Sequence, residues 1–309
     1  MRGEQSVVAA LIVATGKTGR GLSLDPLKKV GTIPAVQRMV MVLRRAGIQR
    51  VVVVCEGEGG SSEKLAPHMG AVYLQGRQNA QMLDNVKVGL AYLLGNCTAA
   101  VIAHVGAPLF SVGTVRALIA AKGPVRIPCY AGRKGHPILL EAGRFESVLT
   151  YFGDGGLAGV IRESGLHREL VPVEDEGVTV NMAGGENHRL PTQLGLSEIY
   201  SDLKIRLARE RPFYGPGAHQ LLQLTREEGS LREACRLMGI SYSKGRGIIA
   251  VIEQQLGSPV IESRQGGKAG GHSTLTPKGE ELARSYDEFC AEARRRLRGL
   301  VPKYFGGLE

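Results

Sequence analysis

The chain has 309 residues, a hydrophobic content of 43% and a formal net charge of +10. This length and composition predict two globular domains and argue against an intrinsically disordered protein. No apolar run reaches the roughly 18 residues of a membrane span, and the N-terminus lacks the apolar core of a signal peptide, so we expect a cytoplasmic protein without a membrane partner. The positive charge favours polyanionic partners without choosing between DNA, RNA and nucleotides.

The cysteines are widely spaced and odd in number, with no C-x-x-C pair. This spacing predicts reduced, mostly buried thiols, and it argues against both disulfides and a zinc site. The residues concerned are Cys55, Cys97, Cys129, Cys235 and Cys290.

The first two-thirds of the chain alternates short apolar runs with amphipathic stretches, which is typical of a mostly parallel sheet with crossover helices. Residues 7–13 form an unbroken apolar run, as expected for a strand buried on both faces. The fold class is therefore α/β, with a Rossmann-like domain over residues 1–196. We predict helices over 33–46, 85–94 and 112–121, and further strands over 50–55, 99–105 and 125–129.

A glycine-rich loop, Ala14-Thr-Gly-Lys-Thr-Gly-Arg20, follows the first predicted strand. Its backbone N–H groups could cradle phosphates, although its spacing matches neither a Walker A loop nor G-x-G-x-x-G. With the segments 84–90, 105–110 and 132–137, this loop resembles MobA-like NTP transferases over residues 6–190. A lone histidine beside a proline, such as His136, is more often structural than a ligand contact. The resemblance implies these nucleotide-binding candidates: Ala14, Gly16, Lys17, Thr18, Arg20, Asn85 and His136.

Nucleotidyl transfer requires a cation on the triphosphate and Mg²⁺ held by carboxylates. The chain lacks the family's lysine, unless Lys28 or Lys29 reaches back, and it lacks the family's metal carboxylates. We therefore expect no catalytic residue, no metal site and no certain cofactor, with Mg²⁺ and an NTP needed only if the domain is active. A ligand-sensing pseudo-enzyme, a scaffold or dimer-forming domain, and a working molybdopterin cytidylyl- or guanylyltransferase remain alternatives. The degenerate positions are Asp25, Gly106, Asn181 and Ala183.

The last third of the chain has a different pattern, with short helices in place of strands. After a linker over 197–216, consisting of a helix over 197–211 and a break, we predict helices over 219–228, 230–237 and 241–256. Ser230 and Ser241 are placed as N-caps, and Met238-Gly-Ile240 forms a turn of helix-turn-helix spacing. Two strands over 259–264 and 273–276 then flank a glycine-rich tip.

The third of these helices presents hydroxyl and cationic side chains from its first turns, where they can reach phosphates and base edges. Gly245 and Gly247 each disfavour this helix by roughly 1 kcal/mol. An ordinary helical domain with a flexible hairpin is the alternative to a DNA-binding domain. The DNA-binding candidates are Ser241, Tyr242, Ser243, Lys244 and Arg246, with Arg264, Lys268 and His272 from the hairpin.

The runs 229–244 and 264–279 closely resemble the winged-helix domain of molybdate-dependent, ModE-type regulators, which is related to the LysR-type fold. The resemblance covers residues 217–290 and implies a winged helix-turn-helix domain over 217–299. Where that family has Ala-Trp in the recognition helix, this chain has Gly245-Arg246, so we expect a different operator. The family's molybdate-binding segment does not follow before Glu309.

Together the two resemblances imply a transcriptional regulator linked to molybdenum or molybdopterin metabolism. Its expected partners are double-stranded DNA, a nucleotide, molybdopterin or molybdate effector, and a second copy of the chain. The closing helix, over 277–297, joins two subunits in such regulators, but it could equally pack on its own domain. A basic protein that binds nucleic acid without sequence preference is a further alternative.

Overall fold

The computed structural model describes residues 7–17, 25, 27–55, 69–77, 80–182, 203–264 and 272–306. The chain divides into two compact units, Met1–Leu196 (unit 1) and Ser197–Glu309 (unit 2). Among the described helices, none combines the length and the apolar character needed to cross a membrane.

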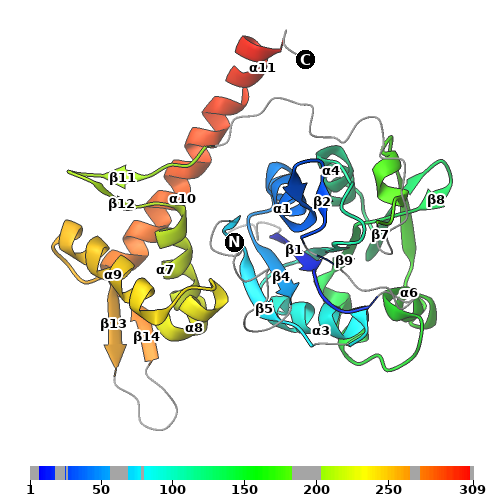
Figure 1. The fold of residues 1–309 in the computed structure, drawn as a ribbon, viewed down its shortest axis with the longest axis horizontal. Coiled ribbons are helices and arrows are strands. Elements are labelled where there is room, and N and C mark those ends of the chain that lie inside the picture. Colours follow the sequence, from blue (N-terminus) through cyan, green and yellow to red (C-terminus); the bar gives the residue numbers. More distant parts are fainter. Residues whose placement is uncertain are drawn as a thin grey trace. The chain divides into compact units, whose positions relative to one another are not determined.

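Unit 1 is built on a mostly parallel sheet with the strand order β10-β7-β9-β6-β1-β4-β5, and β8 pairs with β7 (Figure 1). The central β1 is parallel to both neighbours, whereas β9 is antiparallel to β6 and β7. Residues 9–13 of β1 are fully buried, which explains their continuous apolar run. The strands are β1 Val8–Val13, β4 Val51–Cys55, β5 Val72–Gln75, β6 Ala99–His104, β7 Val125–Tyr130, β8 Arg133–Lys134, β9 Ile138–Glu141 and β10 Arg168–Pro172.

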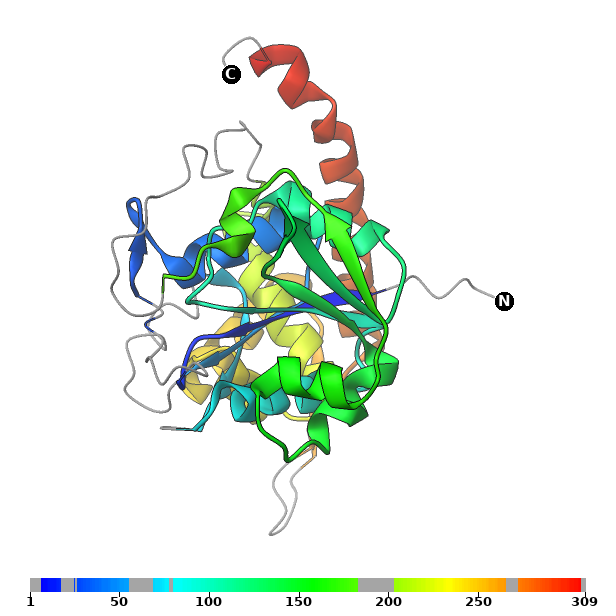
Figure 2. The same cartoon turned by 90° about the vertical axis from the view of Figure 1, so that its right-hand side faces the viewer.

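Helices cover both faces of this sheet. Figure 2 shows the sheet between one layer that contains α1 and α4 and another that contains α3, α5 and α6. The predicted α/β class is thus confirmed, together with all the predicted strands and helices of residues 7–129. The helices are α1 Ala35–Arg45, α3 Met82–Leu93, α4 Val112–Ala120, α5 Phe145–Leu149 and α6 Gly156–Glu163, with 3-10 turns η1 Ala142–Arg144 and η2 Glu176–Thr179 and a small hairpin of β2 Lys29–Val30 and β3 Ile33–Pro34.

Unit 2 is helical with two small antiparallel hairpins. The predicted N-caps are present, since the hydroxyls of Ser230 and Ser241 accept hydrogen bonds from the backbone three residues ahead. The three short helices, the hairpin and the closing helix all lie where they were predicted. The elements are β11 Leu207–Ala208, β12 Pro212–Tyr214, α7 Pro216–Glu228, α8 Leu231–Leu237, α9 Tyr242–Leu256, β13 Ile261–Arg264, β14 His272–Leu275, α10 Pro277–Arg298 and α11 Leu300–Phe305.

The predicted linker helix over 197–211 is wrong in the part that the structure describes. Residues 203–206 are irregular, and β11 pairs with β12 in an antiparallel hairpin. The segment Lys204-Ile-Arg-Leu207 alternates charged and apolar residues with a period of two, which favours an extended strand over a helix.

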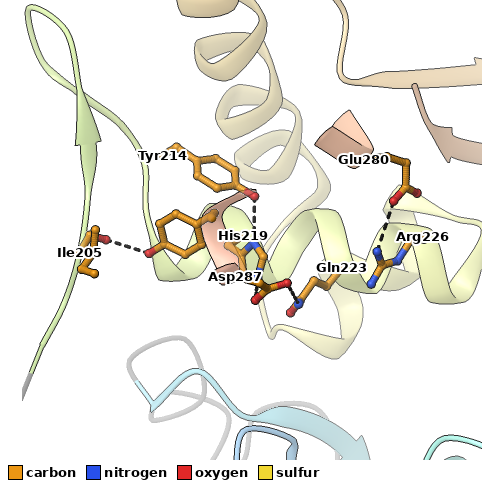
Figure 3. A network of polar contacts seen from close by, with 8 residues as sticks. Ile205, Tyr214, His219, Gln223, Arg226, Glu280 and Asp287 are labelled. Atoms are coloured by element: carbon orange, nitrogen blue, oxygen red, sulfur yellow. Dashed lines mark hydrogen bonds and ion pairs between the residues drawn. The ribbon is translucent and has the colours of Figure 1, made fainter. Parts of the chain in front are cut away.

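This hairpin belongs to unit 2, because polar contacts tie it to α7 and α10 (Figure 3). Tyr214 Oη lies 2.9 Å from His219 Nδ1, and His219 Nε2 lies 2.9 Å from Asp287 Oδ1. The hydroxyl of Tyr286 donates to the carbonyl of Ile205 at 2.8 Å, and its ring packs edge-on against Tyr214. The segment predicted as a linker therefore forms part of the core of the second domain.

Gly245 lies where α9 packs against Cys235 of α8. A Cβ on Gly245 would stand 2.2 Å from Cys235 Sγ, whereas a Cβ on Gly247 would meet no atom within 4 Å. From the sequence, both glycines were expected to destabilise α9. Only Gly247 could be replaced by a better helix former without a clash, because no atom lies within 4 Å of its ideal Cβ position. Gly245 is the residue that lets the two helices pack.

We therefore expect Gly245→Ala to destabilise unit 2 by about 1–3 kcal/mol, the usual cost of overpacking a core. The matched change Gly247→Ala should stabilise it by up to about 1 kcal/mol, because alanine is the better helix former. Urea unfolding of both variants measures these values. Equal effects at the two positions would contradict the packing role of Gly245.

Candidate functional site

The C-terminal edge of the sheet of unit 1 contains a topological switch point. The chain runs from β1 to β4 and β5 on one side, and then crosses to β6 on the other side of β1. Ligands of open α/β sheets bind at the carboxyl ends of the strands flanking such a reversal. The loop after β1 (Ala14–Lys17) and the loop after β6 (residues 105–107) both begin there, and Val105 N donates to Val13 O at 3.1 Å.

Asn85, a nucleotide-binding candidate, holds the loop after β1 in place. Its buried side chain donates from Nδ2 to the carbonyls of Thr15 and Arg77, each at 3.4 Å, and Oδ1 accepts from Arg77 N at 2.8 Å. Gly16 adopts a left-handed φ of +96°, and a Cβ there would approach Asn85 Nδ2 to 2.9 Å. Asn85 is thus a positioning residue, and its hydrogen-bonding groups are directed at the main chain.

The other described candidates in this loop are also tied to the protein. Ala14 is buried, and its N–H donates to Val54 O at 2.8 Å. The backbone of Lys17 donates to Ala80 O at 3.2 Å and accepts from Met82 N at 3.1 Å. The backbone donors of Ala14 and Lys17 are therefore engaged already, and the side chain of Lys17 is exposed. The candidates Thr18 and Arg20 lie outside the described residues.

The loop after β6 is held by two charged side chains, the buried Arg38 and the half-buried Asp175. The guanidinium of Arg38 donates from Nη1 to the carbonyls of Pro108 and Phe110 at 3.0 and 3.2 Å. Burial lowers the pKa of Arg38 to about 10, opposed by the charge of Asp175, so the guanidinium is protonated at neutral pH. Asp175 in turn accepts from Ser111 N at 2.7 Å. Neither charge was singled out from the sequence, because the partners lie far apart along the chain.

The degenerate positions of the sequence come together at this edge. Met182 N donates to Gly106 O at 2.5 Å, and Lys28 Nζ donates to Met182 O at 2.5 Å, so Lys28 reaches back to the residue that is hydrogen-bonded to Gly106. Asn181 is the neighbour of Met182. The exposed carboxylate of Asp25 accepts a hydrogen bond within its own turn. Ala183 lies outside the described residues.

These residues do not fit a divalent metal ion. Across the described parts of the chain, no group of three or more His, Cys, Asp and Glu side chains is arranged to hold one. An ammonium group beside Gly106 also repels a cation. The described residues at this edge therefore supply no set of carboxylate ligands of the kind that Mg²⁺-dependent transfer requires.

Two histidines meet near the same edge. The rings of His104, the last residue of β6, and His136 stand edge to face with their centroids 4.7 Å apart. Burial lowers the pKa of His104 to about 3 and that of His136 to about 4, so both imidazoles are neutral at neutral pH. Among the described residues, His104 Nδ1 and the buried Thr15 Oγ1 have no hydrogen-bond partner. A buried polar group left unpaired costs about 1–3 kcal/mol.

The front of α9 is the second candidate site. Ser241 caps the helix by accepting from Lys244 N at 3.2 Å. The side chains of Tyr242, Ser243, Lys244 and Arg246 are all exposed, while the intervening Gly245 is buried against α8. The first turns of α9 therefore present hydroxyl, aromatic and cationic groups to solvent.

Arg232 of α8 extends this exposed face, although it was not singled out from the sequence. Its guanidinium carbon lies 5.1 Å from the centre of the Tyr242 ring, a cation–π distance. Arg232 stands in the first turn of α8, where its positive charge opposes the helix dipole. This unfavourable position is the sequence signal that could have identified Arg232 as a candidate.

Of the three DNA-binding candidates in the hairpin, the structure describes the backbone of Arg264 and of His272. His272 begins β14 and is exposed, and Arg264 ends β13 opposite it. Ser273 N donates to Gly229 O at 2.7 Å, which attaches the hairpin to the end of α7. Lys268 lies outside the described residues.

Comparisons with known proteins give one family and several partial likenesses. A 77-residue segment, 25% of this chain, is 38% identical to molybdenum-pterin-binding protein MopB of Rhodobacter capsulatus, and it spans only 28% of that relative.

Three solved structures resemble the chain at low identity. Rv0371c of Mycobacterium tuberculosis H37Rv, in a complex with manganese, is 18% identical, with 55% of this chain and 89% of that chain covered and a TM-score of 0.45. A nucleotidyl transferase from Methanothermobacter is 18% identical, with 55% of this chain and 88% of that chain covered and a TM-score of 0.47. A 4-diphosphocytidyl-2C-methyl-D-erythritol synthase from Anaerococcus prevotii is 13% identical, with 58% of this chain and 92% of that chain covered and a TM-score of 0.47.

The family comparison covers the part of the chain that forms the sheet and its C-terminal edge. The model of the MobA-like NTP transferase domain matches residues 10–170, more than half of the chain. The chain belongs to the MobA-like NTP transferase domain family.

Proposed function

We propose that the chain is a DNA-binding transcriptional regulator linked to molybdenum or molybdopterin metabolism and acting in the cytoplasm. In this proposal unit 2 is a winged helix-turn-helix domain of the ModE type, and the NTP transferase-like domain no longer catalyses. The observation that carries the proposal is the front of α9, where Tyr242, Ser243, Lys244 and Arg246 are exposed together on one capped helix.

The order of elements in unit 2 supports this reading. A short turn joins α8 to α9, and the β13–β14 hairpin follows, which is the arrangement of a helix-turn-helix with a wing. Recognition helices place the side chains of their first turns against base edges in the major groove. Lys244 and Arg246 would contact bases and phosphates there, with Arg232 beside them, and Arg264, Lys268 and His272 would reach the backbone from the wing.

The degenerate edge of unit 1 supports a role in ligand sensing over one in catalysis. Lys28, Gly106 and Asn181 supply no carboxylate for a metal ion, yet the loop around Gly16 keeps its shape through Asn85. The likeness to MopB, a molybdenum-pterin-binding protein, favours an effector of molybdenum chemistry: molybdate, molybdopterin or a related nucleotide.

A homodimer is part of the proposal, because regulators of this kind read paired half-sites. Tyr286 and Cys290 of α10 are buried within their own unit, so the first part of that helix packs on its own domain. Phe289 is 54% exposed and Tyr304 of α11 is 67% exposed. The outer face of α10 and α11 is therefore the surface that we propose for the second copy.

The rival function is a working molybdopterin cytidylyl- or guanylyltransferase with an attached DNA-binding module. We expect no pyrophosphate release above the blank when the full chain is incubated with Mg²⁺, molybdopterin and each NTP. The double variant Gly106→Asp, Asn181→Asp is the comparison, because it places carboxylates at two of the described degenerate positions, Gly106 and Asn181. Steady turnover by the unmodified chain would favour the rival.

Selection of bound duplexes from a random DNA pool tests the regulator proposal. The expected result is one enriched motif, with two half-sites about 10 base pairs apart or a multiple of that spacing if the chain binds as a dimer. A pool that remains random after repeated rounds indicates binding through phosphates alone and removes the proposal.

A further inference from the structure

The carboxylate of Glu253 joins α9 to the strand that follows it. Glu253 lies in the last turn of α9, and its Oε1 accepts hydrogen bonds from Val260 N at 3.0 Å and from Ile261 N at 3.4 Å. Ile261 is the first residue of β13, and Val260 is fully buried just before it. Within the described residues, these two hydrogen bonds are the ones that link α9 to the start of the β13–β14 hairpin.

The hairpin is attached to the rest of unit 2 at two further points. Thr276 N, directly after β14, donates to Val260 O at 3.1 Å, and Thr276 Oγ1 donates to Pro259 O at 2.8 Å, next to the first turn of α10. Ser273 N donates to Gly229 O at 2.7 Å, at the end of α7. These bonds hold the hairpin to α7 and α10, so its placement relative to α9 depends on Glu253.

The charge of Glu253 is unfavourable where it stands. A carboxylate in the last turn of a helix faces the negative end of the helix dipole. In a unit proposed to bind DNA, it also repels phosphates. The two backbone donors offset these effects, because a charged acceptor forms stronger hydrogen bonds than a neutral one and the buried N–H of Val260 needs a partner. Glu253 therefore contributes through the geometry that it imposes on the hairpin.

We propose that Glu253 is a positioning residue for DNA recognition, which holds the β13–β14 hairpin and the front of α9 in one register on the duplex. The inference rests on the regulator function proposed above and specifies how its two contact surfaces are aligned. Glu253 itself contacts no DNA, and it acts through the hairpin that carries Arg264, Lys268 and His272.

Fluorescence anisotropy of the full chain with the selected duplex and with a scrambled duplex tests this role. Glu253→Ala should weaken binding to the selected duplex by about 10-fold or more, as the loss of one or two wing contacts would. Its binding to the scrambled duplex should stay the same or tighten, because a negative charge has been removed. Glu253→Gln keeps an oxygen acceptor and should bind the selected duplex within about 3-fold of the unmodified chain.

Two further variants separate geometry from charge. Glu253→Asp keeps the charge but draws the acceptor back by one methylene, so it should also weaken the selected complex, by about 3-fold or more. Glu262→Ala is the matched control, because it removes the same charge from an exposed position of β13 and should weaken neither complex.

Hydrogen exchange of the same variants reports the hairpin without DNA. The amides of Val260 and Ile261 should exchange faster in Glu253→Ala and Glu253→Asp and stay protected in Glu253→Gln, while the amides of α7 keep their protection in all three. This measurement shows that unit 2 remains folded when the hairpin is released from α9.

The proposal is overturned if Glu253→Ala and Glu253→Asp bind the selected duplex as the unmodified chain does. It is also overturned if Glu253→Gln is as weak as Glu253→Ala, or if the selected and scrambled complexes weaken equally. Selective binding that ignores Glu253 removes this inference alone. Equal affinity of the unmodified chain for the two duplexes removes the regulator function, and this inference with it.

Discussion

Replacing both Lys244 and Arg246 with alanine is expected to weaken binding to the selected duplex by about 100-fold or more. Each side chain is exposed on the first turns of α9. Loss of one base-reading arginine typically costs about 1–3 kcal/mol, and loss of a phosphate contact lowers the salt dependence of binding by about one unit. Fluorescence anisotropy over a range of salt concentrations measures both the affinity and its salt slope.

The matched control removes the same charge from unit 1. Arg133 and Lys134 form β8 and are exposed, so their double replacement with alanine also lowers the net charge by two. We expect this control to bind the selected duplex within about 3-fold of the unmodified chain, because β8 belongs to unit 1 and is no part of the face that we propose to contact DNA. Equal losses in the two double variants would mean that net charge, and not the front of α9, holds the DNA.

Acidification is expected to destabilise unit 1 through the pair of His104 and His136. Burial lowers the pKa values of His104 and His136 to about 3 and about 4 in the folded chain. The unfolded chain, whose histidines have a pKa near 6.5, therefore binds more protons between about pH 6.5 and pH 4. Stability is full above about pH 6.5, and we expect the free energy of unfolding to fall by about 1–3 kcal/mol between pH 7 and pH 5.5.

Urea-dependent hydrogen exchange of the amides in β1 and β6 measures this loss for unit 1 alone. His136→Gln should reduce the loss by about half, because one of the two titrating imidazoles is removed. His167→Gln is the control, since the side chain of His167 is 77% exposed. A loss of stability that is the same in the unmodified chain and in His136→Gln would show that the histidine pair does not cause it.

The central strands could be predicted because burial on both faces leaves a plain signal. β1 and β4 are continuous apolar runs; α1 and α3 pack on β1, and every residue of β4 is buried. β9 and β10 were missed, because β9 has only four residues and the edge strand β10 mixes charged with apolar positions. The first strand of the hairpin before α7 was predicted as part of a helix, although the period-two alternation over 204–207 favours a strand, and its second strand was predicted as a break.

The candidate site could be predicted in part. The absence of carboxylates at Gly106 and Asn181 is visible in the sequence, and so are the hydroxyl and cationic residues at the front of α9. The contact of Lys28 with Met182 joins residues 154 positions apart, and no local pattern reports such a contact. Likewise, only packing shows that Gly245 serves the crossing of α8 and α9 and that Arg232 lies over Tyr242.

The most direct test of the account is the ratio of affinities for the selected duplex and for a scrambled duplex of the same composition, measured at one physiological salt concentration. If the front of α9 reads base edges, the selected duplex should bind about 1,000-fold more tightly or better, as specific regulators do. Equal affinities for the two duplexes would contradict the claim that unit 2 recognises DNA sequence.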